Sequence, residues 1–362
     1  MSEMCGTFEY GLNAAAKEFD GKNKYIRITD IDDASREFLL SDLSSPDICL
    51  DGMSKYLLSS GDIVFARTGA SVGKTYIYRE NDGIVYFAGF LIRAKVNQDN
   101  DAEFVFQSTL SPSYEKYIRI TSQRSGQPGV NAQEYGEYDL FAPSKEEQQR
   151  IGHFLRGIDN LITLHQRECI SFAGRADWLI LTANKKRTTS SWEQRKVQDV
   201  ADRFDNLRIP VAANLRVHGT TPYYGANGIQ DYVEGFTHDG EFVLVAEDGA
   251  NDLKNYPVKC VNGRIWVNNH AHVLQGKAGI SDNSFLAFAI SQSDIESLLV
   301  GGSRAKLNAE TLMSIEFKLP CLQEQYRIGE YLTQLDHLIT LHQRELEKLQ
   351  NIKKSMLEKM FV

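Results

Sequence analysis

The chain has 362 residues, of which 42% are hydrophobic and 24% charged, and these values are typical of folded globular proteins and exclude a disordered chain. No stretch approaches about eighteen uncharged apolar residues and acids are scattered through the first thirty, so we predict no membrane span, no signal peptide and a cytoplasmic protein. The cysteines never stand as Cys-x-x-Cys, which argues against a disulfide framework and a zinc site; they are Cys5, Cys49, Cys169, Cys260 and Cys321.

The formal net charge of −8 comes from two acidic blocks. Residues 1–142 carry 14 Lys and Arg against 21 Asp and Glu, and residues 192–319 carry 12 against 16. Neither block is a basic binder of polyanions as a whole. Binding of nucleic acid would therefore depend on local basic loops or on a basic partner.

Residues 1–142 are predicted to form a mixed α/β module. β-rich runs bounded by glycine and polar turns occupy 61–69, 83–96 and 138–143, and helical pieces are expected around 101–121. The last of the three β-rich runs leads into the next element, so we expect the module to end in a strand.

Residues 143–187 follow as a predicted long helix, with a polar linker at 188–191. Steps of four and three residues give an apolar stripe at a coiled-coil period, interrupted by one histidine. The stripe is Ile151, Leu155, Ile158, Ile162, His165, Cys169, Phe172, Ala176, Leu179 and Ala183.

Residues 188–319 repeat the plan with a different sequence, since β-rich runs lie at 240–250, 263–274 and 314–320 and helical pieces at 283–300. Residues 320–362 form a second predicted long helix with a matching stripe from Ile328 through His342 to Met360. We therefore predict an α/β (α+β) fold with two mixed modules and two long helices that pack antiparallel as a coiled coil.

The two helices begin with one sequence written twice, 177 residues apart. Residues 143–168 read PSKEEQQRIGHFLRGIDNLITLHQRE and residues 320–345 read PCLQEQYRIGEYLTQLDHLITLHQRE, with 16 of 26 positions identical. The same offset relates Asn131-Ala132 to Asn308-Ala309. Constant connectors between divergent modules indicate two different readers held in fixed geometry.

This arrangement resembles the specificity subunit of bacterial type I restriction–modification systems. The resemblance rests on Gln-x-Arg-Ile followed by [Ile/Leu]-Asp-x-Leu-Ile-Thr-Leu-His-Gln-Arg in both helices and on WEQRKV at 192–197. The segments Thr221-Pro222-Tyr223-Tyr224-Gly225 and Lys24-Tyr25-Ile26-Arg27 are also similar.

The resemblance implies a non-catalytic subunit with two target-recognition domains that each read one half of a split sequence in double-stranded DNA. It implies two modification (methyltransferase) subunits and restriction (ATP-dependent translocase and nuclease) subunits as partners. S-adenosylmethionine, ATP and Mg²⁺ are then used on those partners, with no cofactor on this chain.

The chain departs from the pattern in two places. No WEQRKV-like segment precedes the first module, which opens at Ser2-Glu3-Met4-Cys5, so we expect it to be less completely anchored than the second. Beyond Glu168 and Glu345 the two helices differ, so strict twofold symmetry is not expected there.

Candidate DNA contacts lie in polar, glycine-flanked loops. In the first module the sequence after the strand at 61–66 and the loop 122–127 combine cations and amides with glycine, which suits phosphate and guanine contacts. The predicted contacts are Arg67, Thr68, Ser71, Lys74, Gln123, Arg124 and Gln127.

The corresponding loops of the second module are more acidic, and acids accept from cytosine while asparagine pairs with adenine. The predicted contacts are Asp248, Asn251, Ser303, Arg304 and Lys306, together with Tyr223, Tyr224 and Asn227, for which a tyrosine-rich turn is an equal alternative.

Two other functions remain as alternatives. The segment Gly69-Ala70-Ser71-Val72-Gly73-Lys74-Thr75 suggests a P-loop nucleotide hydrolase, although it has three residues between its glycines where a P-loop has four. A coiled-coil adaptor that binds only protein is the other. His270 and His272 could share a strand face, but no third metal ligand accompanies them, and His165 and His342 are interpreted as buried polar markers of helix register. We find no catalytic constellation and predict no metal site.

Overall fold

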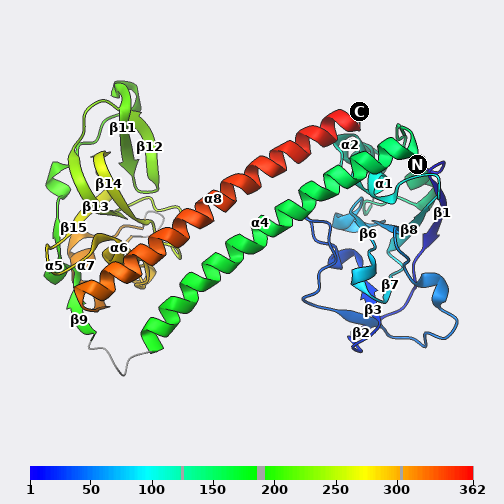
Figure 1. Cartoon of the computed structure of the whole chain (residues 1–362), viewed down its shortest axis with the longest axis horizontal. Coiled ribbons are helices and arrows are strands. Elements are labelled where there is room, and N and C mark those ends of the chain that lie inside the picture. The colour runs from blue at the N-terminus through cyan, green and yellow to red at the C-terminus, as the bar shows by residue number, and fades with distance from the viewer. Residues whose placement is uncertain (124–125, 186–191, 302–304, 362) are drawn as a thin grey trace. The chain divides into compact units, whose positions relative to one another are not determined.

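The computed structural model describes residues 1–123, 126–185, 192–301 and 305–361, with the backbone alone for 173–185 (Figure 1). The chain divides into two compact units. The first unit contains residues 1–169 and 341–362, and the second contains residues 170–340. Each long helix contributes to both units, whereas the predicted boundaries at 142/143, 187/188 and 319/320 follow the sequence repeat.

The first unit is built on a four-stranded antiparallel sheet with strand order β1-β8-β5-β6. β5 reads IVFA and is buried on both faces, which explains its uninterrupted apolar sequence. Two small strand pairs, β3 with β7 (parallel) and β2 with β4 (antiparallel), lie beside this sheet. The strands are β1 (Cys5–Tyr10), β2 (Ala16–Glu18), β3 (Lys24–Ile26), β4 (Ser44–Pro46), β5 (Ile63–Ala66), β6 (Thr75–Ile77), β7 (Val85–Phe87) and β8 (Leu91–Val96).

The helices of this unit are α1 (Ala102–Ser108), α2 (Pro112–Thr121), α3 (Ala132–Gly136) and the long α4 (Lys145–Lys185). Asp101 and Ser111 cap α1 and α2 by accepting hydrogen bonds from backbone N–H groups in their first turns, and Pro112 occupies a first-turn position that needs no donor. The main core joins the sheet, α1, α2 and the start of α4 to the last turns of α8.

The second unit contains a six-stranded sheet with order β10-β15-β13-β14-β11-β12, in which only the β11–β14 contact is parallel. A separate antiparallel pair joins β9 to β16. The elements are β9 (Glu193–Lys196), α5 (Val197–Val200), β10 (Ala201–Arg203), β11 (His218–Gly225), β12 (Gly228–Val233), β13 (His238–Ala246), β14 (Val258–Val267), β15 (Ala271–Gly276), α6 (Asn283–Ser291), α7 (Ala309–Ser314), β16 (Glu316–Leu319) and the long α8 (Leu322–Met360).

Short 3-10 turns complete both units. They are Ile28–Asp30, Ser54–Tyr56, Gly69–Ser71, Glu80–Asp82, Asp205–Leu207, Ala213–Leu215 and Glu296–Leu298. None of the helices, over the residues that the structure describes, is long and apolar enough to cross a membrane.

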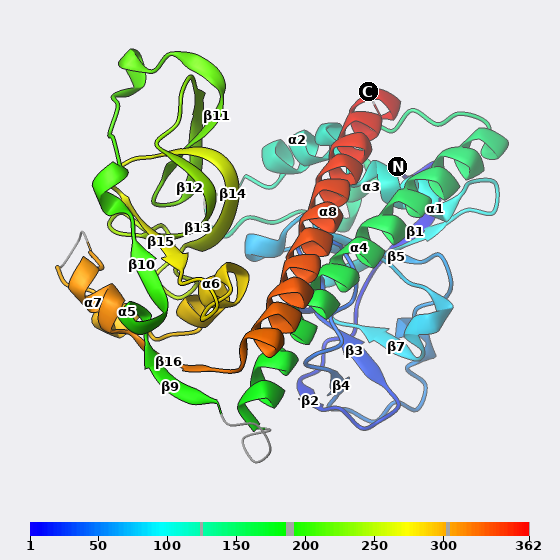
Figure 2. The same cartoon turned by 60° about the vertical axis from the view of Figure 1, so that its left-hand side comes forward.

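The two long helices are in contact and antiparallel where both belong to the first unit, as predicted. Asp159 of α4 contacts Lys353 of α8, and His165, further along α4, contacts His342, which lies earlier in α8. Figures 1 and 2 show the end of α8 beside the start of α4. On α4 the predicted stripe supplies this contact through Leu155 and Ile158, which lie in the main core. On α8, Leu349 and Met356 of the predicted stripe pack against that core, and the buried Leu357 beside them lies outside the stripe.

A glutamine in each helix fastens a module to it. Gln148 is 2% exposed; its side-chain oxygen accepts from the Asp101 N–H at 3.0 Å, and its amide donates to the Pro143 carbonyl at 2.9 Å and to Asn100. Asp101 in turn caps α1. The glutamine of the repeated Gln-x-Arg-Ile thus links the start of α4 to the helix that follows the sheet.

The second unit repeats this clamp. Gln325 is 1% exposed; it accepts from the Asp282 N–H at 3.0 Å and donates to the carbonyls of Ile280 and Pro320 at 3.0 and 2.9 Å. Asp282 caps α6 as Asp101 caps α1. The repeated glycine has a matching reason, since a Cβ at Gly329 would lie 2.6 Å from the Asp282 carboxylate.

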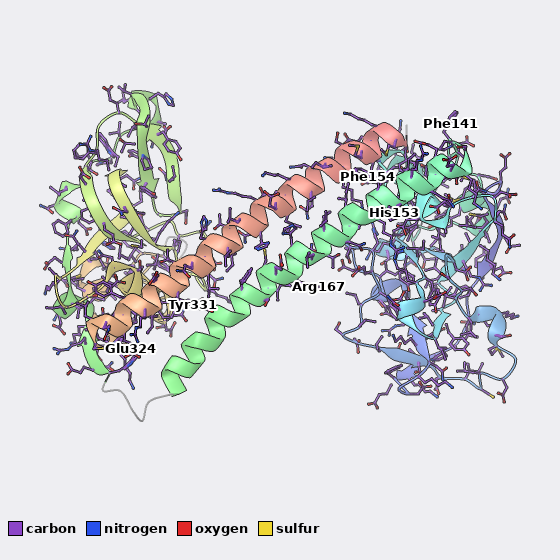
Figure 3. All side chains as sticks on the ribbon, in the orientation of Figure 1. Phe141, His153, Phe154, Arg167, Glu324 and Tyr331 are labelled. Atoms are coloured by element: carbon purple, nitrogen blue, oxygen red, sulfur yellow. The ribbon has the colours of Figure 1, made fainter. Side chains whose placement is uncertain are left out.

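The expected strand at 138–143 is wrong. No strand forms over these residues, and Phe141 is 86% exposed (Figure 3). The equivalent strand of the second unit, β16, exists because β9 from the WEQRKV segment pairs with it. A strand needs a partner, and in the described part of the first unit these residues have none. Each of the predicted β-rich runs 83–96 and 263–274 is divided between two strands by a turn, at 88–90 in the first and at 268–270 in the second.

Candidate nucleic-acid interface

The two predicted loops of the first module lie side by side. Thr68 forms an isolated antiparallel bridge with Gly129, and the Val130 N–H donates to the Arg67 carbonyl at 2.9 Å. Gln127 lies against the start of the turn, where its amide nitrogen is 2.9 Å from the place that a Cβ on Gly69 would take. The segments 67–71 and 126–130 therefore form one continuous polar edge.

Arg67 lies at an aromatic edge of the module. Its guanidinium stacks over the Tyr10 ring, 5.0 Å from the ring centre. Tyr10 and Phe90 are 46% and 59% exposed, and with Arg67 and Arg27 they line a surface hollow of about 570 Å³. Exposed rings beside guanidinium groups offer stacking and charged donors together.

The loop 69–75 is not a P-loop. Gly69 and Gly73 have φ of +72° and +84° and flank a single 3-10 turn, and the chain then enters strand β6, whereas a P-loop opens a helix. Lys74 forms an ion pair with Asp33 at 2.5 Å, and the buried Thr75 hydroxyl lies 2.7 Å from that of Thr109. The lysine and threonine that a nucleotide would need thus already have partners within the protein, and Lys74 can bind a ligand only by leaving Asp33.

The second module assembles its loops at the equivalent place. Asp248 bridges to Lys306 as Thr68 bridges to Gly129, and the Leu307 N–H donates to the Glu247 carbonyl at 2.8 Å. Gly129 and Lys306 differ by the repeat offset of 177. The predicted correspondence of the loops is therefore present in the backbone. The first module has Arg67 and Thr68 at the positions where the second module has the acids Glu247 and Asp248.

Asn227 holds the loop 247–251 in place. Its side-chain amide donates to the Gly249 carbonyl and its side-chain oxygen accepts from the Asn251 N–H, each at 2.9 Å. Asn227 is therefore a positioning residue. Gly249 and Asn251 are exposed at the tip of the loop.

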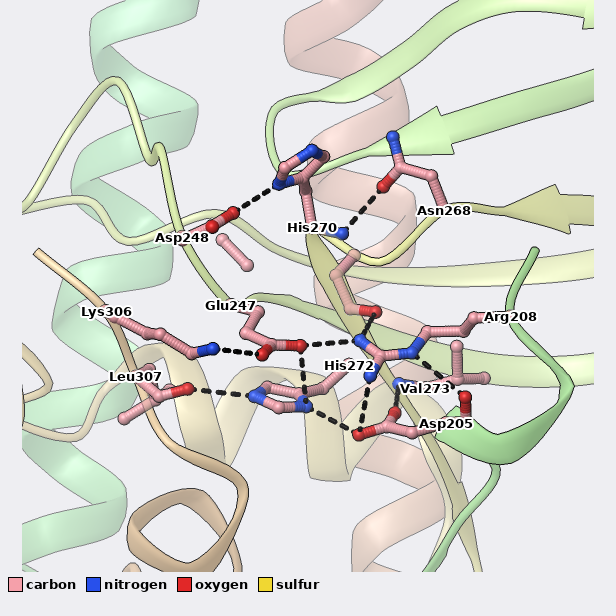
Figure 4. Close-up of polar contacts among 12 residues, drawn as sticks. Asp205, Arg208, Glu247, Asp248, Asn268, His270, His272, Val273, Lys306 and Leu307 are labelled. Carbon is pink, nitrogen blue, oxygen red and sulfur yellow. Dashed lines mark hydrogen bonds and ion pairs between the residues drawn. The ribbon is translucent and has the colours of Figure 1, made fainter. Parts of the chain in front are cut away.

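Beneath this loop lies a network of charged side chains, drawn in Figure 4. Glu247 accepts from Arg208 at 2.6 Å and from Lys306 at 2.8 Å. His272 Nδ1 lies 2.7 Å from the Asp205 carboxylate and Nε2 lies 2.9 Å from the Leu307 carbonyl, so both ring nitrogens face oxygen atoms that accept hydrogen bonds. The network ties 205–208, β15 and the segment 305–307 to the loop 247–251.

The network lowers the pKa of both its carboxyl groups. Burial of Asp205 opposes ionisation, but the His272 ring, the Val273 N–H and Arg208 together bring its pKa below the ordinary value. Glu247 behaves alike, since Lys306 and Arg208 outweigh its burial. Both side chains stay ionised at neutral pH, which keeps the loop bound to its cations.

Above the network, Asp248 faces the His270 ring at 2.5 Å, and the Asn268 side chain accepts from the His270 N–H at 2.8 Å (Figure 4). The side chains of Asp248 and His270 are 37% and 48% exposed. From the sequence, a hydrogen-bonded position at a strand end is the favoured interpretation of His270 over a metal ligand, and these two contacts agree with it. Asp248 and His270 therefore form a pair at the surface, in which the carboxylate is a hydrogen-bond acceptor and the imidazole ring can be a donor.

Tyr223 and Tyr224 are removed from the candidate contacts because both are buried, at 1% and 7% exposure. The end of strand β11 that carries these two residues is covered on both faces. Arg216 lies over the Tyr223 ring at 4.1 Å on one side, and Tyr224 belongs to a core cluster on the other. Their segment is a strand interior and not a tyrosine-rich turn.

Three predicted contacts, Arg124, Ser303 and Arg304, lie outside the described residues. Gln123 is exposed at the edge of that gap in the first module. The residues that sequence reasoning missed are Tyr10, Phe90, Asn268 and His270. Only the turn signal at Asn268-Asn269 hinted at the last two, and the aromatic pair comes together through sheet pairing alone.

The chain matches the model of the type I restriction modification DNA specificity domain twice, over residues 8–170 and 189–351. A putative type I restriction enzyme specificity subunit of Haemophilus influenzae is 44% identical over 149 residues, which are 41% of this chain and 38% of that protein. The type I restriction enzyme MjaVIII specificity subunit of Methanocaldococcus jannaschii is 20% identical over 89% of this chain and 83% of its own length.

The crystal structure of the type I restriction–modification S subunit of Mycoplasma genitalium superposes with a TM-score of 0.72, covering 100% of this chain and 94% of that one at 14% identity. This likeness supports the fold of two sheet modules and long helices. Since the family model matches twice and spans most of the sequence, the chain belongs to the type I restriction–modification specificity subunits, the non-catalytic DNA-specificity components of these systems.

Proposed function

We propose that the chain reads a bipartite sequence in double-stranded DNA, with one half read by each module. The observation that carries this proposal is the equivalence of the two polar edges: the Thr68–Gly129 and Asp248–Lys306 bridges occupy the same place in the two modules. The two loops have the same backbone position in their modules but carry different side chains, as expected of two domains that recognise two different DNA sequences.

The first module presents donors. Arg67, Thr68, Ser71 and Gln127 line its edge, and a guanidinium paired with amide and hydroxyl groups suits phosphate oxygens and the acceptors of guanine. The stacked Tyr10 ring restricts the Arg67 side chain, so less conformational entropy is lost when the guanidinium binds.

The second module presents acceptors as well as donors. The Asp248 carboxylate suits the cytosine amino group, Asn251 suits adenine, and Lys306 suits phosphate. The network behind the loop preorganises it, since Glu247 and Lys306 are held through Arg208 and Asn227 fixes its tip.

The chain also docks two modification subunits, in our proposal, through an apolar stripe present on both helices. Phe154, Leu161 and Leu164 are 47%, 46% and 50% exposed on α4. The residues 177 positions later on α8 are Tyr331, Leu338 and Leu341, at 41%, 37% and 41%. Exposed apolar side chains in such rows mark protein interfaces, and the duplication suits two copies of one partner (Figure 3).

The complete cytoplasmic complex then includes restriction subunits. Methyl transfer from S-adenosylmethionine and any work driven by ATP with Mg²⁺ take place on the partner subunits. This assignment agrees with the acidic balance of both modules, because basic partners can neutralise much of the DNA phosphate charge.

The test is methylome sequencing of cells that carry this chain with its modification subunits. We expect a split target with a spacer of constant length. Arg67→Ala is expected to relax one half of the target and Asn251→Ala the other, whereas the exposed Gln323→Ala on α8 leaves both unchanged. A continuous target, or both halves relaxing in either loop variant, contradicts the proposal.

A further inference from the structure

The contact between His165 and His342 is a second candidate site, built from residues that belong to neither polar edge. The Nδ1 atoms of the two rings lie 2.8 Å apart, and Glu168 Oε2 lies 3.0 Å from His342 Nδ1 and 3.8 Å from His165 Nδ1. These residues lie in the first unit, where α4 and α8 are in contact. Three ligand atoms thus converge on one point of the helical seam.

The geometry matches a tetrahedral metal ion. Zn²⁺ binds imidazole nitrogen and carboxylate oxygen at about 2.0–2.2 Å, which places neighbouring ligand atoms of a tetrahedron roughly 3.3–3.5 Å apart. The distances of 2.8, 3.0 and 3.8 Å lie on both sides of that value. Adjustments of about half an ångström in three side chains would satisfy all three bonds.

We propose that His165, His342 and Glu168 bind one divalent transition-metal ion, with Zn²⁺ as the matching species, and that the ion ties α4 to α8. Two imidazoles with a carboxylate form a donor set that suits Zn²⁺ and disfavours Mg²⁺ and Ca²⁺. The fourth position is left to water or to Glu345, the repeat counterpart of Glu168.

The protonation of the pair is compatible with this role. One ring donates from Nδ1 and the other accepts at Nδ1, since two donors cannot share that contact. A metal ion at both Nδ1 atoms requires the donor ring to carry its proton on Nε2 instead.

Partial exposure lets an ion reach the site. The side chains of His165 and His342 are 21% and 20% exposed and that of Glu168 is 39% exposed. The neighbouring Ile162 packs on the main core of the unit, so the helix positions behind the ligands are fixed. A bound ion would therefore link two elements that already meet.

A second trio, Asp205, Glu247 and His272, has similar spacing but different surroundings. Arg208 and Lys306 already bind its carboxylates, and both ring nitrogens of His272 are occupied, by the Asp205 carboxylate and by the Leu307 carbonyl. These cations take the place that a metal would need.

The experiment is calorimetric titration of the chelator-treated full chain with Zn²⁺. We expect one tight site, an increase of the thermal midpoint with Zn²⁺, and an X-ray absorption signature of imidazole ligation near 2.0 Å. His342→Gln is expected to weaken binding at least tenfold and to remove the increase. Glu168→Gln, at a more exposed position, tests the site if the histidine variant does not fold.

His337→Gln, an exposed histidine of the same helix, is the matched control and should bind Zn²⁺ as the parent chain does. Glu345→Gln weakens binding only if Glu345 is the fourth ligand. A parent chain without a stoichiometric site overturns the proposal, as does undiminished Zn²⁺ binding in both His342→Gln and Glu168→Gln. In that case the two rings form only a hydrogen-bonded pair on the seam.

Discussion

Replacing Gln325 with alanine should loosen the second module from its helix without unfolding the first. The substitution deletes the side-chain oxygen that accepts from the Asp282 N–H and the amide that donates to the Ile280 and Pro320 carbonyls. Gln325 is 1% exposed, so the three partners lose hydrogen bonds inside the protein.

The size of the effect follows from those three bonds. Leaving a buried donor or acceptor without a partner costs about 1–3 kcal/mol, and water that enters the vacated space recovers part of it. We therefore expect a loss of about 3 kcal/mol in the local stability of this junction. Since about 1.4 kcal/mol is a factor of ten, amide exchange at Asp282 and in the first turn of α6 should accelerate roughly a hundredfold.

Hydrogen–deuterium exchange on the full chain measures this directly. Gln148→Ala is the reciprocal variant and should accelerate exchange at 101–105 while leaving 282–286 protected. The exposed Gln323→Ala should leave both segments unchanged. Unaltered protection in Gln325→Ala, or loosening of both junctions by either single variant, would refute the idea of two separate glutamine clamps.

Three further expectations concern reading, docking and acid stability. Arg124 and Arg304 are cations in equivalent loops of the sequence. If they contact bases, Arg124→Ala and Arg304→Ala should each cost about 1–3 kcal/mol of binding free energy and relax one half-site. If they contact phosphate, each substitution should weaken binding to all duplexes alike and flatten its salt dependence. Phe154→Ser combined with Tyr331→Ser should reduce the number of modification subunits bound in sedimentation experiments, with each single variant losing one copy. Burial lowers the pKa of His238, so its contribution to stability is complete above about pH 6.5 and falls as the pH drops through the lowered pKa; urea unfolding between pH 7 and 5 should show this loss in the parent chain and not in His238→Gln.

These expectations fail in distinct ways. Unchanged binding in both arginine variants on matched and singly mismatched duplexes would return those loops to solvated turns. Full occupancy by the modification subunits in the double variant would place the docking surface elsewhere. A parent chain equally stable at pH 7 and 5 would mean that the His238 ring, though bonded to Thr237 and the Phe204 carbonyl, is not excluded from protonation.

The long helices could be predicted because their information is local and written twice. An apolar stripe of constant period, a preceding proline and acids near the start specify a helix without reference to the rest of the chain. The behaviour of 138–143 could not be predicted in this way, because strand formation depends on a partner distant in sequence. Strand β16 forms because it pairs with β9, whereas residues 138–143 have no partner strand in the described part of the first unit.

The reading edges show the same division. Glycine and polar residues marked the loops correctly, and the bridges of Thr68 and Asp248 place them where the repeat implied. Tyr223 and Tyr224 were wrongly predicted as candidate contacts, because a Pro-Tyr-Tyr-Gly sequence has the composition of a turn but forms the buried end of a strand. Contacts such as Glu247 with Arg208 join residues 39 apart through sheet pairing, which composition and periodicity do not encode.

Exchange of the second module tests the central claim most directly. Residues 192–319 would be replaced by the corresponding module of another specificity subunit, and the methylome of cells carrying the hybrid with its modification subunits would be sequenced. Independent reading by two modules predicts that one half of the methylated target changes while the other half stays the same. A change in both halves, or in neither, would contradict it.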